Sequence, residues 1–135
     1  NLEPLDTYLK AKALVEYKEK PEMKEIVDSF TRLVNITEGA ERGEFSPDLF
    51  QLEEERKLWQ AVESRKDGLE GLLKEGSYEE VIEELLKLKD PIDAYFDNVM
   101  VMADDEAQRE NRVNFLLYLK QQFIQLGDLS QVVTE

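Results

Sequence analysis

Apolar residues recur with helical spacing along nearly the whole chain. The clearest run keeps the 3–4 spacing of one buried stripe: Met23, Ile26, Val27, Phe30, Leu33 and Val34. Pro21, just before this run, suits the first position of a helix, where its missing N–H is harmless. A looser stripe covers residues 5–18. The pattern therefore predicts one helix over about 5–18 and a second over about 21–36, with Arg32 and Asn35 on the polar side of the second.

A loop and a long helix follow. The residues that mark the loop as a break between helices are Gly39, Gly43, Ser46 and Pro47. The next helix is expected over about 52–75, because Leu58, Trp59 and further apolar residues keep helical spacing there. Gly68 and Gly71 weaken this helix, so a bend or a close packing contact is expected near them.

Two cap signals divide the chain after residue 75. Ser77 and Glu80 have the spacing of a capping box, which predicts a helix that begins at Tyr78. Asp90 and Pro91 then have the pattern of a second cap, so a short helix is expected to follow and to end near residue 99.

The segment 99–103, Val-Met-Val-Met-Ala, alternates like a strand. We reject a strand because no other segment is suited to pair with it, and an unpaired strand leaves its backbone groups unsatisfied. We expect an apolar turn inserted into the core. Asp104, Asp105 and Glu106 then open a last helix, with Asp104 as its cap, and this helix is expected to run to about residue 126 and to end at Gly127.

The last helix is apolar on almost every side over residues 115–119, so we expect it to be the most buried one. The sequence shows no repeat and no internal boundary. The predicted fold class is all-α: a helical bundle of five or six helices that forms a single domain over residues 1–135.

Composition excludes several kinds of site. The chain has 135 residues with no Cys and no His, which rules out disulfides, cysteine-based zinc sites and histidine-dependent catalysis. It has neither a phosphate-binding glycine loop nor a segment of membrane-spanning length, and its first residues do not resemble a signal peptide. Its net charge of −14 argues against nucleic acid as a partner, unless a local group of basic residues makes the contact.

Several segments in order resemble one family. Residues 90–116, "DPIDAYFDNVMVMADDEAQRENRVNFL", are similar to the C-terminal region of the β subunit of bacterial glycyl-tRNA synthetase, a DALR-type anticodon-binding domain. The further matching segments are "FTRLVNI" at 30–36, "FSPDLFQLEEERKLWQAV" at 45–62 and "QFIQLGDLS" at 122–130. The resemblance covers roughly residues 22 to 131. It departs from the family at Gln108, where Leu is expected, and this departure suggests looser or wetter packing there.

The resemblance implies a role in tRNA recognition. The chain would be a C-terminal fragment of a longer, cytoplasmic protein. It would contact the anticodon end of glycine tRNA and work with an α subunit, in an α2β2 assembly. The α subunit would hold the active site that uses ATP, Mg and glycine. This domain would then have no catalytic residue and no cofactor of its own.

Anticodon recognition needs cations near phosphates and groups that stack on or bond to bases. The residues that match this chemistry are Arg32, Asn35, Asn98, Arg109, Arg112 and Lys120. A structural alternative is that Arg109 and Arg112, which are i, i+3 neighbours, pair with Asp97, Asp105 or Glu106. For Asn35 we favour a structural role as a buried polar group bonded to the 99–103 turn.

Other residues fit less demanding roles. Phe96 and Trp59 are expected in the core, and Tyr95 could stack on a base or pack inside. The acidic residues near 90–105 lack the spacing of a calcium loop, so no metal site is predicted. Two hypotheses remain: a tRNA-binding module, or a structural module that docks on the α subunit. An independent enzyme has little support. The tRNA hypothesis requires arginines of two separate helices to converge on one outward patch.

Overall fold

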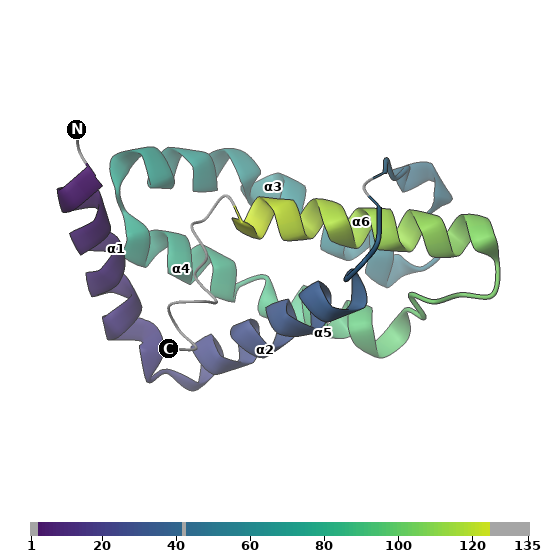
Figure 1. Cartoon of the computed structure of the whole chain (residues 1–135), viewed down its shortest axis with the longest axis horizontal. Coiled ribbons are helices and arrows are strands. Elements are labelled where there is room, and N and C mark those ends of the chain that lie inside the picture. Colours follow the sequence, from purple (N-terminus) through teal and green to yellow (C-terminus); the bar gives the residue numbers. More distant parts are fainter. Residues whose placement is uncertain (1–2, 42, 125–135) are drawn as a thin grey trace.

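The structure is a computed structural model that describes residues 3–41 and 43–124. Within these ranges the chain forms six α-helices and one short 3₁₀ helix, with no strand (Figure 1). The helices are α1 (Glu3–Lys18), α2 (Pro21–Ile36), η1 (Pro47–Leu49), α3 (Glu53–Glu75), α4 (Tyr78–Leu86), α5 (Lys89–Asn98) and α6 (Glu106–Ile124). The predicted all-α bundle of five or six helices is confirmed. The expected end of the last helix at Gly127 lies outside the described residues.

Helix α4 begins at Tyr78, as predicted, but the capping contacts at the helix starts differ from the prediction. Ser77 occupies the N-cap position of α4, but its side chain makes no capping hydrogen bond. Helix α5 begins at Lys89, before Asp90, so Asp90 lies in its first turn and is not the cap. At α6 the cap is Asp105 rather than Asp104, because Oδ2 of Asp105 accepts a 2.9 Å hydrogen bond from the backbone N–H of Gln108.

Helix α3 is continuous through its two glycines. It runs unbroken from Glu53 to Glu75. A Cβ atom built at Gly68 or at Gly71 would meet no side chain within 4 Å. The expected close packing at these glycines is therefore wrong, and the expected bend stays a prediction. The positive φ of Gly76, 72°, ends the helix with the left-handed residue that such ends favour.

The core lies where α6 meets the other helices. Helix α3 packs on α4 and α5, and α2 packs on α4, α5 and α6. Phe115, Leu116 and Leu119 of α6 are almost completely buried, as the apolar run over residues 115–119 predicts. Phe115 meets three aromatic rings, from Phe45, Phe50 and Tyr95, at centroid distances of 5.2, 5.1 and 6.0 Å. Trp59 and Phe96 pack in the core, as predicted.

Three amide side chains of α6 hold the loop that precedes α3. Asn114 Nδ2 donates to the backbone oxygen of Glu44 at 3.1 Å. Asn111 bonds both backbone groups of Ser46, at 2.7 and 3.1 Å, and Gln108 Nε2 donates to the backbone oxygen of Leu49 at 3.0 Å. Their spacing of three residues places all three on one side of the helix. Gln108 is buried and its Nε2 atom is bonded, but its Oε1 atom is buried without a hydrogen-bond partner among the described residues, so the expected looser, wetter packing at this position stays a prediction.

Helix α1 is joined to α4 by a phenol. The hydroxyl of Tyr17 donates a hydrogen bond to Oε1 of Glu83, and the Nζ atom of Lys20 lies 4.2 Å from the centre of the Tyr17 ring. This hydrogen bond to the Glu83 carboxylate, together with burial, raises the pKa of Tyr17 from its usual 10 to about 12. The neutral phenol is therefore the form that the folded chain favours.

This contact predicts a loss of stability in base. The unfolded chain releases the Tyr17 proton near pH 10 and the folded chain only near pH 12. The contribution to the free energy of unfolding is complete below pH 10 and disappears as the pH rises towards 12. We expect it to be on the order of 1 kcal/mol, since each pKa unit corresponds to about 1.4 kcal/mol and solvent near Glu83 weakens the contact. Urea unfolding of wild type and Tyr17→Phe between pH 8 and 12 measures it, and parallel curves would contradict this assignment.

Candidate functional site

The six predicted contact residues lie on three helices, of which α2 packs on both of the others. Arg32 and Asn35 belong to α2, Asn98 ends α5, and Arg109, Arg112 and Lys120 belong to α6 (Figure 1). Their surroundings differ sharply. One guanidinium is exposed, one is half-buried and one is inside the core.

Arg32 is the exposed one. Its guanidinium carbon lies 4.5 Å from the centre of the Phe96 ring, which holds the flat cation against α5. Within residues 3–41 and 43–124, no carboxylate lies within ion-pair distance of Arg32. Asn35, less than one turn further along α2, is also exposed. The favoured structural role for Asn35, as a buried group bonded to the 99–103 turn, is therefore wrong.

Asn98 is the last residue of α5, the helix that also carries Phe96. Its side chain is exposed, and its Nδ2 atom donates to the backbone oxygen of Ala94 at 2.8 Å. This bond uses one donor of the amide. The amide oxygen can still accept a hydrogen bond.

Arg109 organises the turn before α6. Its Nη1 atom donates to the backbone oxygens of Ala103 at 3.0 Å and Asp104 at 3.5 Å. No ion pair joins it to Asp97, Asp105 or Glu106 in the described part of the chain, so the predicted local pairing is wrong for Arg109. The half-buried guanidinium keeps other N–H groups available.

Arg112 lies inside the protein. Its Nη2 and Nε atoms donate to the two carboxylate oxygens of Glu55 at 3.1 and 3.4 Å, and its Nη1 atom donates to the backbone oxygen of Met100 at 2.8 Å. Glu55 is 0% exposed and Arg112 5%. The predicted pairing partners of Arg112 are wrong, because the actual partner comes from α3. Arg112 is not an outward residue, and the predicted patch of converging arginines does not include it.

Lys120 is half-buried in the second half of α6. Eleven residues separate it from Arg109, which is about 16 Å along a helix axis. The structure gives it no ion pair among the described residues. A role for Lys120 in binding stays a prediction.

The segment 99–103 has two faces that the sequence did not reveal. Val99 and Val101 are buried, whereas Met100 and Met102 are 69% and 54% exposed. The segment is not a strand, as predicted, but it enters the core only with its valines. The expectation of a wholly apolar plug is wrong for the two methionines, which the alternation of buried and exposed positions places on the outside.

Tyr95 belongs to the interior. Its side chain is completely buried, and its hydroxyl has no hydrogen-bond partner among the described residues. Burial, and then the negative charge of Glu55, raise the pKa of Tyr95 above its usual value. Tyr95 is therefore a neutral core residue, and stacking on a base from outside is excluded in this structure.

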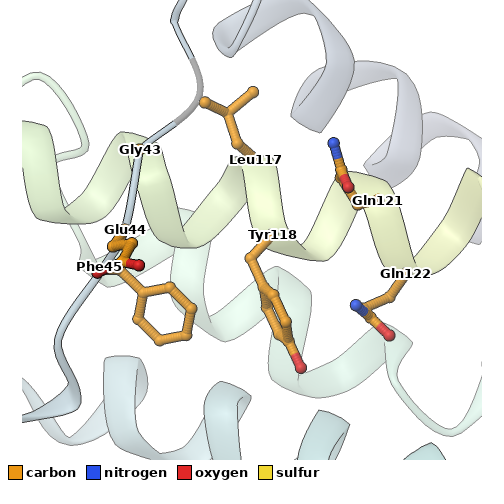
Figure 2. A pocket seen from close by; sticks show the side chains of 7 residues that line it. All are labelled: Gly43, Glu44, Phe45, Leu117, Tyr118, Gln121 and Gln122. Carbon is orange, nitrogen blue, oxygen red and sulfur yellow. The ribbon is translucent and has the colours of Figure 1, made fainter.

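Two surface hollows flank the first half and the second half of α6. The first has a volume of about 510 Å³, and Ile36, Met102, Arg109 and Val113 are among the residues that line it. The second, about 390 Å³, lies between the 43–45 segment and α6, with Phe45, Tyr118 and Gln122 on its wall (Figure 2). Tyr118 is tied to α3, because its hydroxyl donates to Oε1 of Glu63 at 2.8 Å.

Across residues 3–41 and 43–124, no group of three or more acidic side chains is placed to hold a metal ion. None of the helices in these ranges has the length and apolar character that crossing a membrane requires.

Known proteins of similar sequence belong to a family that is consistent with the all-α architecture. The family model described as the DALR anticodon binding domain matches residues 26–129. The glycine–tRNA ligase beta subunit of Thermotoga maritima is 38% identical over 130 residues, which cover 96% of this chain and 19% of that protein. The beta subunit of Bacillus subtilis is 33% identical over 134 residues, 99% of this chain and 20% of that protein. For Vibrio parahaemolyticus the values are 35% over 130 residues, 94% and 19%.

The chain thus spans about a fifth of the length of these relatives. The family match covers α2 from Ile26 onwards and all later described helices, and it leaves out α1. All six predicted tRNA contacts lie within the matched residues. The chain belongs to the family of DALR anticodon-binding domains.

Proposed function

We propose that this chain is the tRNA-binding module of a glycine–tRNA ligase β subunit and that it contacts the anticodon end of glycine tRNA. Ligation would take place in the α subunit, with ATP, Mg and glycine bound there. The support is the family match over residues 26–129 and the likeness of nearly the whole chain to glycine–tRNA ligase beta subunits. Cytoplasmic location and an α2β2 assembly form part of the same proposal.

The observation that carries the proposal is the exposed guanidinium of Arg32. Its guanidinium carbon lies 4.5 Å from the centre of the Phe96 ring, and within the described residues no carboxylate forms an ion pair with it. Its outer face is therefore free to stack on an unpaired base, and its N–H groups are free to bond to a base edge or a phosphate. Asn35 and Asn98 add exposed amide groups from the same two helices.

The net negative charge of the chain limits its affinity for RNA. With a net charge of −14, the chain does not attract RNA as a whole. Base contacts at a few positions would supply specificity, and cations elsewhere in the ligase would supply most of the phosphate contacts.

Replacing Arg32 with alanine is the direct test. In the complete ligase we expect Arg32→Ala to raise KM for glycine tRNA roughly tenfold with little change in kcat, since a stacked base contributes about 1–3 kcal/mol. Arg32→Lys keeps the charge but loses the flat stack, so it should recover only part of the effect. Steady-state aminoacylation kinetics measure both.

Lys74→Ala is the matched control, because Lys74 is an exposed cation near the end of α3 without an ion pair among the described residues. It should leave KM for the tRNA unchanged. An Arg32→Ala ligase with the kinetics of the wild type would refute the assigned surface.

The alternative is a structural module that docks on the α subunit. The internal position of Arg112 and the negative charge favour this alternative. A salt series separates the two, because tRNA binding through this domain weakens steeply as salt rises, whereas an apolar subunit contact does not.

A further inference from the structure

The α5–α6 connection exposes apolar side chains although it is firmly held. A surface connection is normally polar and mobile, because it faces water. Here Met100 and Met102 are more than half exposed. The backbone beside them is bound at Val99, whose N–H donates to the backbone oxygen of Tyr95 at 2.8 Å, and at the Met100 oxygen, which accepts from Arg112 at 2.8 Å.

The two arginines of α6 act on this connection from inside. Arg112 is fixed by the buried Glu55 and binds the Met100 oxygen, while Arg109 binds the oxygens of Ala103 and Asp104. Three hydrogen bonds therefore fix both ends of the five-residue segment 99–103, and a fourth holds the next residue, Asp104. A connection that only linked two helices would not need this rigidity. The rigidity keeps the two methionine side chains in place on the surface.

The methionines lie next to the predicted RNA contacts. Burial alternates from Asn98 to Met102, so Asn98, Met100 and Met102 share the outer side of the chain. Met102 lines the 510 Å³ hollow together with Ile36, which is one helical turn from Arg32 on α2. Arg32 in turn covers Phe96, two residues before Asn98. The end of α2 and the end of α5 thus form one continuous surface.

The chemistry of this surface fits an unpaired base better than a phosphate. Thioether groups are polarisable and adapt to flat partners, and single-stranded bases are bound by stacking and by bonds to their edges. The surface offers two thioethers, one guanidinium and two amides. The same hollow has three glutamates in its lining, Glu38, Glu41 and Glu110, and these repel phosphate.

We propose that Met100 and Met102, with Arg32 on Phe96, form a surface that receives unstacked bases of RNA, and that the buried Arg112 positions this surface without touching the RNA. The proposal rests on the proposed function, because the RNA is the tRNA of the ligase. It moves one predicted contact of α6 from Arg112 to the methionines that the arginines of α6 hold in place.

Oxidation of methionine provides a readout in the complete ligase. This segment of the protein has three methionines, and Met23 is 2% exposed, so it serves as an internal reference. Dilute peroxide followed by peptide mapping gives an oxidation rate for each. We expect glycine tRNA to slow oxidation of Met100 and Met102 at least fivefold and to leave Met23 unchanged.

The same assay distinguishes RNA from protein as the partner. If the α subunit slows oxidation of Met100 and Met102 in the β subunit without tRNA, the surface is a subunit interface and the proposal is overturned. A gel shift on the same samples shows whether tRNA is bound. Bound tRNA with unprotected methionines would overturn this inference and leave the proposed function intact, whereas an Arg32→Ala ligase with unchanged kinetics would refute the proposed function itself.

Variants give a second, independent measurement. The ligase with Met100→Ser and Met102→Ser should show a KM for tRNA raised roughly tenfold, because it lacks both apolar contacts to the bases. Met100→Leu and Met102→Leu should restore KM, because they keep the apolar contact. Val15→Ser, at a 70% exposed position on α1, is the control and should have no effect on KM. A serine variant with an unchanged KM would overturn the proposal.

Discussion

Replacing Arg112 with alanine should lower the free energy of unfolding by about 3–5 kcal/mol, the range for breaking one half of a buried ion pair. The change leaves the carboxylate of Glu55, which is 0% exposed, without its charged partner. It also removes the donor to the Met100 oxygen, which holds the α5–α6 connection. Urea unfolding of the chain, followed by circular dichroism, measures the loss.

A surface ion pair on α3, the helix that carries Glu55, is the control. Lys57 pairs with Glu53 at 3.3 Å, and both side chains are well exposed. Lys57→Ala should lower stability by less than about 1 kcal/mol, as is usual for exposed pairs. If Arg112→Ala had an equally small effect, the Glu55–Arg112 pair would have no special structural role.

Replacing both partners should recover part of the stability. Glu55→Met combined with Arg112→Met removes both buried charges, and such apolar replacements are often neutral or better. Recovery will be incomplete here, because Oε1 of Glu55 also accepts the backbone N–H groups of Gln51 and Leu52 at 3.2 Å each. The double variant leaves these two donors without their carboxylate, and because both bonds are only part-buried the cost of each should stay below the roughly 1–3 kcal/mol of a fully buried donor.

The sequence was sufficient to predict the helices, because their apolar stripes are regular. The stripe of α2 is confirmed by the burial of Met23, Ile26, Val27 and Leu33. Capping was predicted less well. Ser77 and Asp90 are residue types that often cap helices, and both stand at or near a helix start. The side chain of Ser77 nevertheless makes no capping hydrogen bond, and α5 begins one residue before Asp90. Cap signals indicate a helix start to within a few residues, and the side-chain bond depends on the neighbouring chain.

The sequence contained a signal for the buried Glu55–Arg112 ion pair, but the charged residues near Arg112 made this signal hard to recognise. Arg112 follows Arg109 by three residues among several acidic ones, which favoured an exposed position. Yet α6 is apolar around Phe115 and Leu116, and Arg112 precedes them by three and four residues, on the same side of the helix. Glu55 likewise stands three residues before Leu58 on the buried side of α3. Opposite charges on two buried stripes indicate an internal pair.

The exposed side of the candidate site was harder to predict. Arg32 and Asn35 were placed correctly on the polar side of α2. The contact of Arg32 with Phe96 joins α2 to α5, and sequence spacing within one helix does not report contacts between helices. The outward position of the methionines depends on the backbone of residues 99–103, which the arginines of α6 hold by hydrogen bonds.

The second large effect is expected at Phe115, the residue at the centre of the aromatic cluster. Phe115 is completely buried and meets the rings of Phe45, Phe50 and Tyr95 within 6.0 Å. Phe115→Ala removes the shared partner of these rings and opens a cavity. We expect a loss of about 3–5 kcal/mol in the free energy of unfolding, the usual range for a buried Phe. Urea unfolding of the variant and the wild type gives the difference.

Two variants separate the cavity from other effects. Phe115→Leu keeps much of the volume, so its loss should stay near about 1.5 kcal/mol, as for other volume-conserving changes. Leu117→Ala alters a half-buried residue of the same helix and should lower stability by less than Phe115→Ala, because less apolar surface returns to water.

The loop between α2 and α3 reaches the core chiefly through Phe45 and Phe50. Phe115→Ala should therefore also loosen residues 43–50, and faster amide hydrogen exchange in these residues would measure this effect. Unchanged exchange in this loop would show that the amide bonds from Asn111 and Asn114 hold it without help from the aromatic cluster.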